Sequence, residues 1–328
     1  MLKAQYTDRG PVPQDVIDAV EFQTPELQAG EVLLEVLAAP INPSDVLTLT
    51  GEYGILPPLP AVGGNEGVGR VIQQGEDVAS PAVGQTVLLP PGAGTWCTHM
   101  VAAAEGLMPL PNEADAQQLA MMKVNPPTAS LMLSEFVALK AGDWLIQNVA
   151  NSGVGAYVIQ FAKIRGFKTA NVVRRESAVA GVEELGADVV LVDGPDLAER
   201  VAEATSNSSI QLAIDAVGGE ATNRLAECVS EGGTLVNYGM MSGEACTISP
   251  ASFIFRDITL RGFWLSKWFQ KATAEQRVAV FGEVGELIAT GKLHTKVAAT
   301  YDISQIKDAV AAAHAGGRNG KILLLPNG

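Results

Sequence analysis

The sequence predicts an α/β protein in which a β-rich part is followed by a doubly wound parallel sheet. Two observations carry this prediction. Through the first ~115 residues, short runs of β-branched residues are bounded by Gly and Pro, which is typical of strands and turns. From residue 142 to residue 265, short apolar strands alternate with helical segments. Such alternation indicates a parallel sheet with helices on both faces, and right-handed crossovers make it doubly wound.

The clearest strands of the first part lie in residues 30–45 and 68–78. Prolines are frequent from Pro40 to Pro81, so we expect strands and loops there rather than helices. The alternating part then runs in order along the chain. Its expected strands are 142–149, 168–173, 188–192, 210–217, 232–239 and 258–265, and its expected helices are 153–166, 178–187 and 196–205.

The C-terminal tail is expected to hold a long helix from Ala272 to Thr290, a helix that ends at Ala313 and a closing strand, 320–325. This tail is too small to fold alone, so we expect it to pack on the N-terminal part. The expected domains are 1–117 completed by 267–328, and 118–266.

The composition fits two domains and narrows the range of partners. The 328 residues include 22 Lys or Arg and 36 Asp or Glu, a net charge of −14. This acidity disfavours nucleic acids and anionic membranes, and neither is expected as a partner. The first ten residues lack the apolar stretch of a signal peptide. The three cysteines, Cys97, Cys228 and Cys246, form no CxxC pair. We therefore expect a cytoplasmic protein.

A glycine-containing turn follows the first strand of the alternating part. It runs from Ala150 to Gly155, and Ala150 and Ser152 replace two glycines of the usual dinucleotide-binding pattern. At such a turn, backbone N–H groups and the start of the next helix can approach a pyrophosphate. Because the turn opens a series of strands and helices, it indicates a dinucleotide site.

Arg174 and Arg175 follow the second strand of this series, where NAD-binding proteins usually carry an acidic residue. A guanidinium suits the 2′-phosphate of NADP, whereas a carboxylate would repel it. Two solvated loop arginines are the alternative, but after this turn and strand the pattern favours NADPH.

Five segments carry a resemblance to a known family: QNVANSGVG (147–155), VNPPTA (124–129), INPSD (41–45), AVGGNEGVG (61–69) and RGFWLSKW (261–268). In these segments the chain resembles the medium-chain dehydrogenase/reductase superfamily, and within it the mitochondrial-type 2-enoyl thioester reductases. The NPSD and NEGVG segments are shared with quinone reductases. The resemblance implies a GroES-like catalytic domain built from both chain ends, an inserted Rossmann domain, and a homodimer.

The resemblance also implies which residues border NADPH. Asn125 would contact the cofactor near its nicotinamide, and Asn42 would help to orient the nicotinamide or the substrate carbonyl. The family often has an arginine where this chain has Glu176, which would weaken 2′-phosphate binding. Tyr238 and Trp264 as core aromatics, and Lys321 as a surface charge, remain alternatives. The other expected cofactor residues are Asn151, Ser152, Gly153, Val154, Gly155, Arg174, Arg175, Tyr238, Gly239, Met240, Met241, Phe263, Trp264, Leu265, Ser266 and Lys321.

No metal site is expected. Zinc enzymes of the superfamily have a Cys near the NPSD position and a His in a G-H-E motif, where this chain has Asn42–Asp45 and Gly64-Asn65-Glu66, and zinc requires such ligands. The three histidines are scattered, and none is spaced with a cysteine as a ligand pair.

Without a metal, reduction of a conjugated C=C bond needs a hydrogen-bond donor for the enolate and an acid for the α-carbon. A tyrosine hydroxyl can supply both, because it is protonated at neutral pH. Tyr53 lies in a Gly- and Pro-rich loop, GEYG, and the resemblance places the proton-donating tyrosine of the family there. Trp264 is the second candidate catalytic residue, expected to shape the pocket beside the nicotinamide.

Three functions remain open at this stage. The first is NADPH-dependent, metal-free reduction of 2-enoyl thioesters carried by CoA or acyl-carrier protein, with Tyr53 as the acid. The second is a quinone or general enone reductase of the same fold, in which Tyr53 would matter little. The third is an NADPH-binding protein without turnover, because a fold does not determine a function.

Overall fold

The protein is described here from a computed structural model that covers residues 1–90, 92–317 and 320–327. Its contacts divide the chain into two compact units. Unit 1 comprises Met1–Val124 and Gly285–Gly328, and unit 2 comprises Asn125–Val284. The unit limits therefore fall at 124/125 and 284/285. The domain limits expected from the sequence were 117/118 and 266/267. Gln118 exchanges two hydrogen bonds of 3.0 and 2.9 Å with the backbone of Thr295, which ties the residues just before Asn125 to unit 1.

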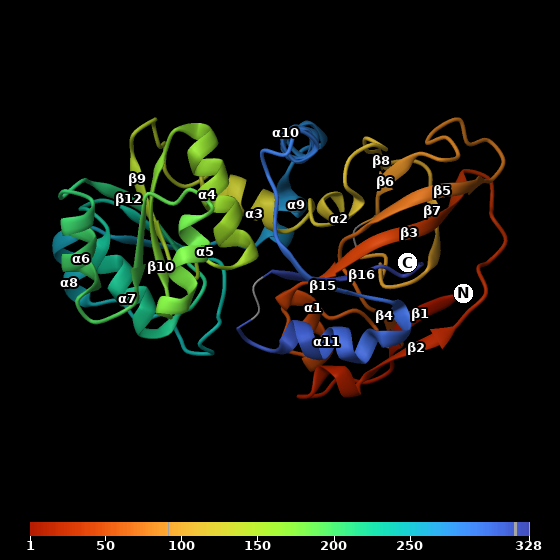
Figure 1. Cartoon of the computed structure of the whole chain (residues 1–328), viewed down its shortest axis with the longest axis horizontal. Helices are drawn as coiled ribbons and strands as arrows, with labels where there is room; N and C mark the ends of the chain where they lie inside the picture. Colours follow the sequence, from red (N-terminus) through yellow and green to blue (C-terminus); the bar gives the residue numbers. More distant parts are fainter. Residues whose placement is uncertain (91, 318–319, 328) are drawn as a thin grey trace. The chain divides into compact units, whose positions relative to one another are not determined.

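Unit 1 is built around a seven-stranded sheet with the order β15-β16-β3-β5-β6-β8, in which β7 also pairs with β3. A three-stranded sheet, β2-β1-β4, accompanies it (Figure 1). The strands are β1 (Leu2–Tyr6), β2 (Ile17–Glu21), β3 (Glu31–Ile41), β4 (Ala61–Val62), β5 (Val68–Gln74), β6 (Thr86–Leu88), β7 (His99–Ala103), β8 (Met108–Pro109), β15 (Val297–Tyr301) and β16 (Lys321–Leu324). The helices are η1 (Pro13–Asp15), α1 (Pro43–Thr50), α2 (Ala116–Ala120), η3 (Ile303–Gln305) and α11 (Ile306–His314).

Both ends of the chain contribute to the main sheet of unit 1. Strand β16 runs antiparallel to β3, with Ile322 opposite Ile41. Side chains from β1, β3, α1, α11 and β16 form one apolar core, which includes Tyr6 and Leu49. Helix α1, whose Leu49 belongs to this core, has Asn42 at its N-cap and is followed by the loop that carries Tyr53.

Helix α1 lies in the proline-rich stretch where we expected only strands and loops, so that expectation is wrong for Pro43–Thr50. Proline is tolerated at the first turn of a helix, where its missing N–H is not needed. A capping box between Asn42 and Asp45 satisfies the start of the helix, and Gly51 ends it with a left-handed φ of 86°.

Unit 2 contains a six-stranded parallel sheet with the order β11-β10-β9-β12-β13-β14. The strands are β9 (Trp144–Gln147), β10 (Lys168–Val173), β11 (Val189–Val192), β12 (Ile210–Asp215), β13 (Thr234–Asn237) and β14 (Thr259–Gly262). The helices are α3 (Asn125–Met132), α4 (Gly153–Arg165), η2 (Glu176–Ala178), α5 (Val179–Glu183), α6 (Leu197–Ala204), α7 (Gly219–Cys228), α8 (Pro250–Arg256), α9 (Leu265–Lys271) and α10 (Ala274–Ala289), of which α10 continues into unit 1.

Two apolar clusters cover the two faces of this sheet. One joins the strands to α6 and α7 through residues such as Val201 and Leu225. The other joins them to α4 and α5 through Ile159 and Val182, and Figure 1 shows these helix pairs on opposite faces. The predicted doubly wound α/β arrangement is therefore confirmed. The long helix expected from Ala272 to Thr290 is confirmed as α10, whereas the short helix α9, which ends at Lys271, was not predicted.

Candidate active site

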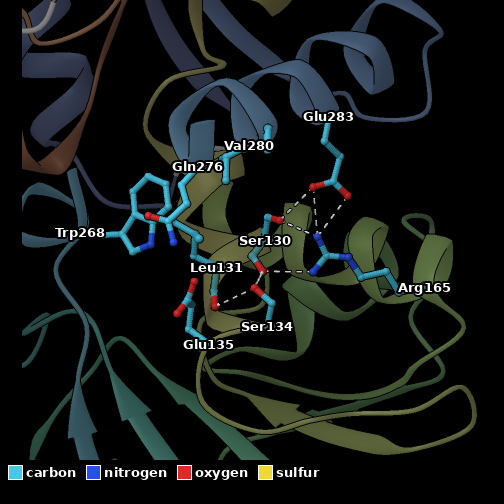
Figure 2. Close-up of a pocket in the computed structure, with 10 residues that line it drawn as sticks. Ser130, Leu131, Ser134, Glu135, Arg165, Trp268, Gln276, Val280 and Glu283 are labelled. Carbon is cyan, nitrogen blue, oxygen red and sulfur yellow. Dashed lines mark hydrogen bonds and ion pairs between the residues drawn. The ribbon is translucent and has the colours of Figure 1, made fainter. Parts of the chain in front are cut away.

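An open pocket of unit 2, with a volume of about 350 Å³, lies among helices α3, α4, α9 and α10 (Figure 2). The Arg165 guanidinium donates to the Ser130 carbonyl oxygen at 3.0 Å and to the Glu283 carboxylate at 3.2 Å. Trp268 and Gln276 also line the pocket. None of the predicted cofactor or catalytic residues is among its lining residues, so we place the candidate site elsewhere.

The carboxyl edge of the parallel sheet gathers most of the predicted cofactor residues. The strand registers place Gln147 beside Asn171, Val173 beside Val192, and Asp215 beside Asn237, so all the strands end at the same edge. In open α/β sheets, ligands bind outside this edge. The predicted residues that directly follow these strand ends are Asn151–Gly155, Arg174, Arg175, Tyr238–Met241 and Phe263–Ser266.

The turn after β9 packs tightly against its own backbone. At Gly155, an added Cβ would lie 2.6 Å from the Ala150 carbonyl oxygen and 2.7 Å from that of Val149, so only glycine fits. Val149 has a φ of 50°, which is rare for a β-branched residue and marks local strain of the kind found at functional sites. The Ser152 hydroxyl oxygen accepts from the Gly155 N–H at 3.0 Å and caps α4. Ser152 therefore replaces a glycine of the usual pattern without loss of the turn.

Ser152 also connects this turn to the residues after β13. Its side chain is hydrogen-bonded to that of Tyr238. Burial raises the pKa of the Tyr238 hydroxyl, the Ser152 bond lowers it, and nearby Asp215 raises it further. Tyr238 is thus neutral at physiological pH and serves to join two loops of the edge.

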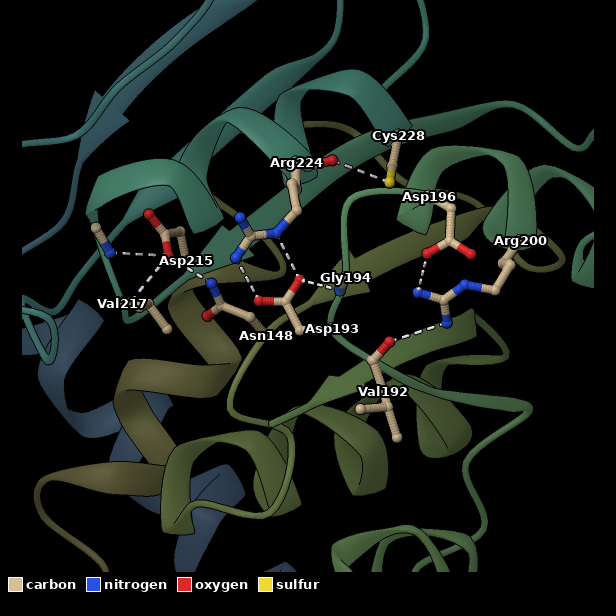
Figure 3. A network of polar contacts seen from close by, with 11 residues as sticks. Asn148, Val192, Asp193, Gly194, Asp196, Arg200, Asp215, Val217, Arg224 and Cys228 are labelled. Atoms are coloured by element: carbon tan, nitrogen blue, oxygen red, sulfur yellow. Dashed lines mark hydrogen bonds and ion pairs between the residues drawn. The ribbon is translucent and has the colours of Figure 1, made fainter. Parts of the chain in front are cut away.

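Arg174 and Arg175 are both exposed directly after β10. Asp193 occupies the equivalent place after β11, where its N–H donates to the Val173 carbonyl oxygen at 2.8 Å. The Asp193 carboxylate is held by Arg224, with Nε and Nη2 at 2.7 and 2.6 Å (Figure 3). No acidic side chain of the described residues forms an ion pair with Arg174 or Arg175. The two arginines therefore fit an anionic group such as a 2′-phosphate.

Asp215 organises the middle of the edge and was missed by sequence reasoning. Its carboxylate accepts from Asn148 Nδ2 at 2.6 Å, from the Thr222 hydroxyl at 2.7 Å and from Asn237 Nδ2 at 3.0 Å. It also accepts from the Val217 N–H at 2.8 Å (Figure 3). This network fixes the loops after β9, β12 and β13 against one another. The sequence contained a signal for this network, because the polar residues Asn148, Asp215 and Asn237 stand at or directly after the ends of three expected strands.

The remaining predicted residues of unit 2 lie around this edge. Asn125 is buried at the first position of α3. The Phe263 ring packs edge-on against Phe136, with ring centroids 6.0 Å apart. Trp264 is half-buried at the cap of α9, whereas Met240 and Met241 are exposed.

Asn42 and Lys321, two further predicted residues, lie in unit 1 and contact each other. Lys321 Nζ donates to Asn42 Oδ1, and Asn42 Nδ2 donates to Glu66 Oε1 at 2.7 Å. Both side chains are buried, so Lys321 is not a surface charge. Glu66 Oε2 accepts from the N–H groups of Lys123 and Val124 at 3.1 and 2.9 Å. The Asn42 amide is thereby oriented from both sides.

Two more buried ionisable groups complete this cluster in unit 1. Burial raises the pKa of Asp45 to about 7, against a hydrogen bond from the Asn42 backbone. Burial lowers the pKa of Lys123 to about 8, against the attraction of Glu66 and Asp45. Asn65 Nδ2 donates to Asp45 Oδ1 at 2.7 Å. Sequence reasoning quoted Glu66 within a family motif but gave it no role.

Tyr53 is half-buried in the loop that follows α1. Its N–H donates to the Leu47 carbonyl oxygen at 3.1 Å, so the backbone of the residue is anchored to the last turn of the helix. Ile55, Leu56 and Leu59 follow on the same loop and are 37–48% exposed. The structure thus presents Tyr53 on an apolar loop of unit 1.

Among residues 1–90, 92–317 and 320–327, no three His, Cys, Asp or Glu side chains lie close enough to hold a metal ion. Asn42 and Asn65 take the two positions that zinc enzymes of the superfamily give to Cys and His, and their amides are committed to the hydrogen bonds above. Burial raises the pKa of both Cys97 and Cys228 to about 12, so these thiols stay protonated and are poor ligands.

Two family models match the chain. The alcohol dehydrogenase GroES-like domain matches residues 28–112, and the zinc-binding dehydrogenase model matches residues 153–281. Enoyl-acyl-carrier-protein reductase, mitochondrial, of Rattus norvegicus is 39% identical, over 86% of this chain and 77% of that protein. The enzyme of the same name from Caenorhabditis elegans is 38% identical, over 84% of this chain and 82% of that protein.

Solved structures agree over almost the whole chain. A putative NADPH:quinone reductase from Bacillus thuringiensis has a TM-score of 0.89 and 29% identity, covering 99% of this chain and 98% of its own. The Etr1p complex with NADP and crotonyl-CoA has a TM-score of 0.87 and 28% identity, and covers 99% of both chains. The Etr1p/Etr2p heterodimer of Candida tropicalis, a mitochondrial 2-enoyl thioester reductase, has a TM-score of 0.88 and 29% identity, and also covers 99% of both.

These findings overturn one expectation and settle the family. The expected cytoplasmic location is wrong, because the relatives are named as mitochondrial enzymes; an acidic composition with few cysteines is compatible with either compartment. No helix of the described part of the chain is both long and apolar enough to cross a bilayer. By sequence and by fold, the chain belongs to the enoyl-acyl-carrier-protein reductase family of the medium-chain dehydrogenase/reductase superfamily.

Proposed function

We propose that this protein reduces the C=C bond of 2-enoyl thioesters with NADPH. The observation that carries the proposal is the similarity over most of the chain to enzymes named enoyl-acyl-carrier-protein reductase, together with the likeness to the Etr1p complex with NADP and crotonyl-CoA. The thioester would be carried by CoA or by acyl-carrier protein.

The residues at the carboxyl edge of the unit 2 sheet suit NADPH. The turn after β9 is strained at Val149, and only glycine fits at position 155. This turn would place the start of α4 beside the pyrophosphate. The exposed guanidinium groups of Arg174 and Arg175 would bind the 2′-phosphate. Tyr238 and the Asp215 network would keep the surrounding loops in place. When bound, NADPH supplies the hydride for the β-carbon.

In unit 1 the proposed acid is Tyr53. A tyrosine hydroxyl is a hydrogen-bond donor, so that of Tyr53 would hydrogen-bond to the developing enolate oxygen or donate the proton to the α-carbon. Asn42, oriented by Glu66 and Lys321, would help to position the nicotinamide or the carbonyl. Trp264 would shape the pocket beside the nicotinamide.

The test follows NADPH oxidation with crotonyl-CoA, with trans-2-hexenoyl-CoA and with a soluble quinone, for wild type, Tyr53→Phe and Tyr301→Phe. NADH is the cofactor control, and Tyr301, a half-buried tyrosine of β15, is the matched control position. We expect thioester turnover that prefers NADPH and a large loss of kcat in Tyr53→Phe alone. Full thioester turnover by Tyr53→Phe would refute the role of Tyr53.

A second candidate is an NADPH:quinone reductase, favoured by the likeness to the Bacillus thuringiensis structure of that name. A quinone needs no carbon protonation by a placed acid. Quinone turnover that ignores Tyr53→Phe, with no thioester turnover, would support this candidate. NADPH binding without oxidation by any acceptor would instead indicate a non-enzymatic protein.

We further propose that the chain forms a homodimer through β14 of unit 2. This strand is the last of its sheet, and an open sheet edge favours pairing. The preceding helix, α8, exposes Ile254 by 70% and Phe255 by 76%, which is unusual for large apolar side chains. The Etr1p/Etr2p structure is a heterodimer. Light scattering should give the molecular mass of a monomer for Ile254→Asp and that of a dimer for the control variant Val278→Asp on α10. A monomeric wild type would refute the proposal.

A further inference from the structure

The loop that carries Tyr53 is held by an arginine far from it in the sequence. Arg9 lies in the segment after β1, and its Nη2 donates to the Pro57 carbonyl oxygen. The stem of the same side chain lies against Gly51, with Cδ 3.4 Å from the position of an added Cβ. Arg9 therefore contacts the loop on both sides of Tyr53, at its first residue and four residues after the tyrosine.

Arg9 is itself fixed to the core of unit 1. Its guanidinium is hydrogen-bonded to the hydroxyl of Tyr6, which is 2% exposed. The neighbouring Gly10 N–H donates to the Leu49 carbonyl oxygen at 3.1 Å, near the end of α1. The Arg9 side chain thus links the buried core to a loop whose other residues are largely exposed.

The start of the loop is anchored by its own backbone. The N–H groups of Glu52 and Tyr53 donate to the Leu47 carbonyl oxygen at 2.9 and 3.1 Å, which anchors only the start of the loop. At its far side, Arg9 Nη2 donates to the Pro57 carbonyl oxygen. Arg9 Nε is buried without a partner among the described residues. An unsatisfied buried donor opposes stability.

From this geometry we propose that Arg9 is a positioning residue for the reaction: it braces the loop of residues 51–60 and so fixes where the Tyr53 hydroxyl lies. The inference rests on the proposed role of Tyr53. A displacement of a catalytic group by about 1 Å is enough to lower a rate roughly 100-fold. Loss of the brace should therefore lower kcat and leave the binding of NADPH, whose phosphates are assigned to unit 2, unchanged.

The experiment compares Arg9→Met, which keeps the apolar stem, with Tyr53→Phe, the double variant, and Arg70→Met on β5 as a matched control. We expect Arg9→Met to lower kcat with crotonyl-CoA by about 10- to 100-fold. In the Tyr53→Phe background the same change should have no further effect, because Arg9 acts through Tyr53. Arg70→Met should behave as wild type. A kcat loss from Arg9→Met that persists in the double variant would overturn the proposal.

A second measurement separates this inference from the proposed function. Hydrogen–deuterium exchange of the peptide that spans residues 51–60 should be faster in Arg9→Met than in wild type, with no change in the peptides of β3. Unchanged exchange would overturn the brace whatever Tyr53 does. Faster exchange with wild-type kcat, while Tyr53→Phe is inactive, would refute the positioning role alone. Full activity of Tyr53→Phe would refute the assigned acid.

Discussion

Replacement of Glu66 by glutamine should destabilise unit 1 strongly, although the two side chains have almost the same shape. The Glu66 carboxylate accepts three hydrogen bonds, from Asn42 Nδ2 at 2.7 Å and from the N–H groups of Lys123 and Val124 at 3.1 and 2.9 Å. Glutamine has one acceptor oxygen, so its NH₂ group must face at least one of these donors. Asn42 cannot turn its amide to compensate, because its oxygen accepts from Lys321.

The magnitude follows from two estimates that agree. Each buried donor left without an acceptor costs about 1–3 kcal/mol, and glutamine leaves one or two of them. Removal of one partner from a buried charged cluster costs about 3–5 kcal/mol, and here the lysines at 123 and 321 lose a carboxylate. We expect a loss of about 4 kcal/mol in the free energy of unfolding, which lowers Tm by roughly 10 °C for a unit of this size.

The assay is thermal unfolding of the NADPH-free protein, followed by circular dichroism and calorimetry. Glu26→Gln is the matched control, because Glu26 is an exposed carboxylate of the same unit. The control should unfold within about 2 °C of wild type, as is usual for surface changes. A Glu66→Gln variant that also unfolds within 2 °C of wild type would refute the reasoning, since the three hydrogen bonds would then contribute no net stability.

Three further predictions concern the cofactor edge and the buried acid. Arg174→Gln combined with Arg175→Gln should weaken NADPH binding by about 10- to 100-fold and leave NADH binding unchanged, as measured by fluorescence titration; equal weakening of both would contradict a 2′-phosphate role. Gly155→Ala should weaken the binding of both cofactors at least 10-fold, because the added Cβ would lie 2.6 Å from a backbone oxygen. Gly181→Ala is the control and should bind both cofactors normally, because a Cβ at position 181 has no atom within 4 Å. The pKa of Asp45 is raised from 3.8 to about 7 in the folded protein, so its contribution to stability is fully present below pH 3.8 and falls by about 3 kcal/mol as the pH rises from 4 to 7. Urea unfolding of Asp45→Asn should show a smaller decline over this pH range than wild type, and an identical decline would contradict the assignment.

The role of the buried cluster in unit 1 shows why motifs alone were insufficient. Asn42 and Glu66 lie in segments that resemble a family, but the resemblance assigns Asn42 to the nicotinamide or the substrate carbonyl, Lys321 to the cofactor, and gives Glu66 no role. In the structure their side chains first bind one another. Their interaction with a cofactor remains a prediction, and the structure adds that they are oriented before any ligand arrives.

The fold class, the order of the sheet-forming segments, the glycine at 155 and the paired arginines were determined by the sequence itself. Each of these signals is local, since strand and helix periodicity, turn residues and residues after a strand end are set within a few positions of one another. Several helices were not predicted, and α1 among them escaped because a proline-rich stretch hid a capped helix start.

Only the tertiary structure decided which distant polar groups meet. Glu66 binds Asn42 across 24 positions, Arg9 binds Pro57 across 48, Asp215 binds Asn148 across 67, and Lys321 binds Asn42 across 279. Such pairs depend on how the strands are ordered in each sheet and on which loops share an edge. A buried polar group must find a partner, but the choice among many possible partners is made by the topology, which local sequence patterns do not encode.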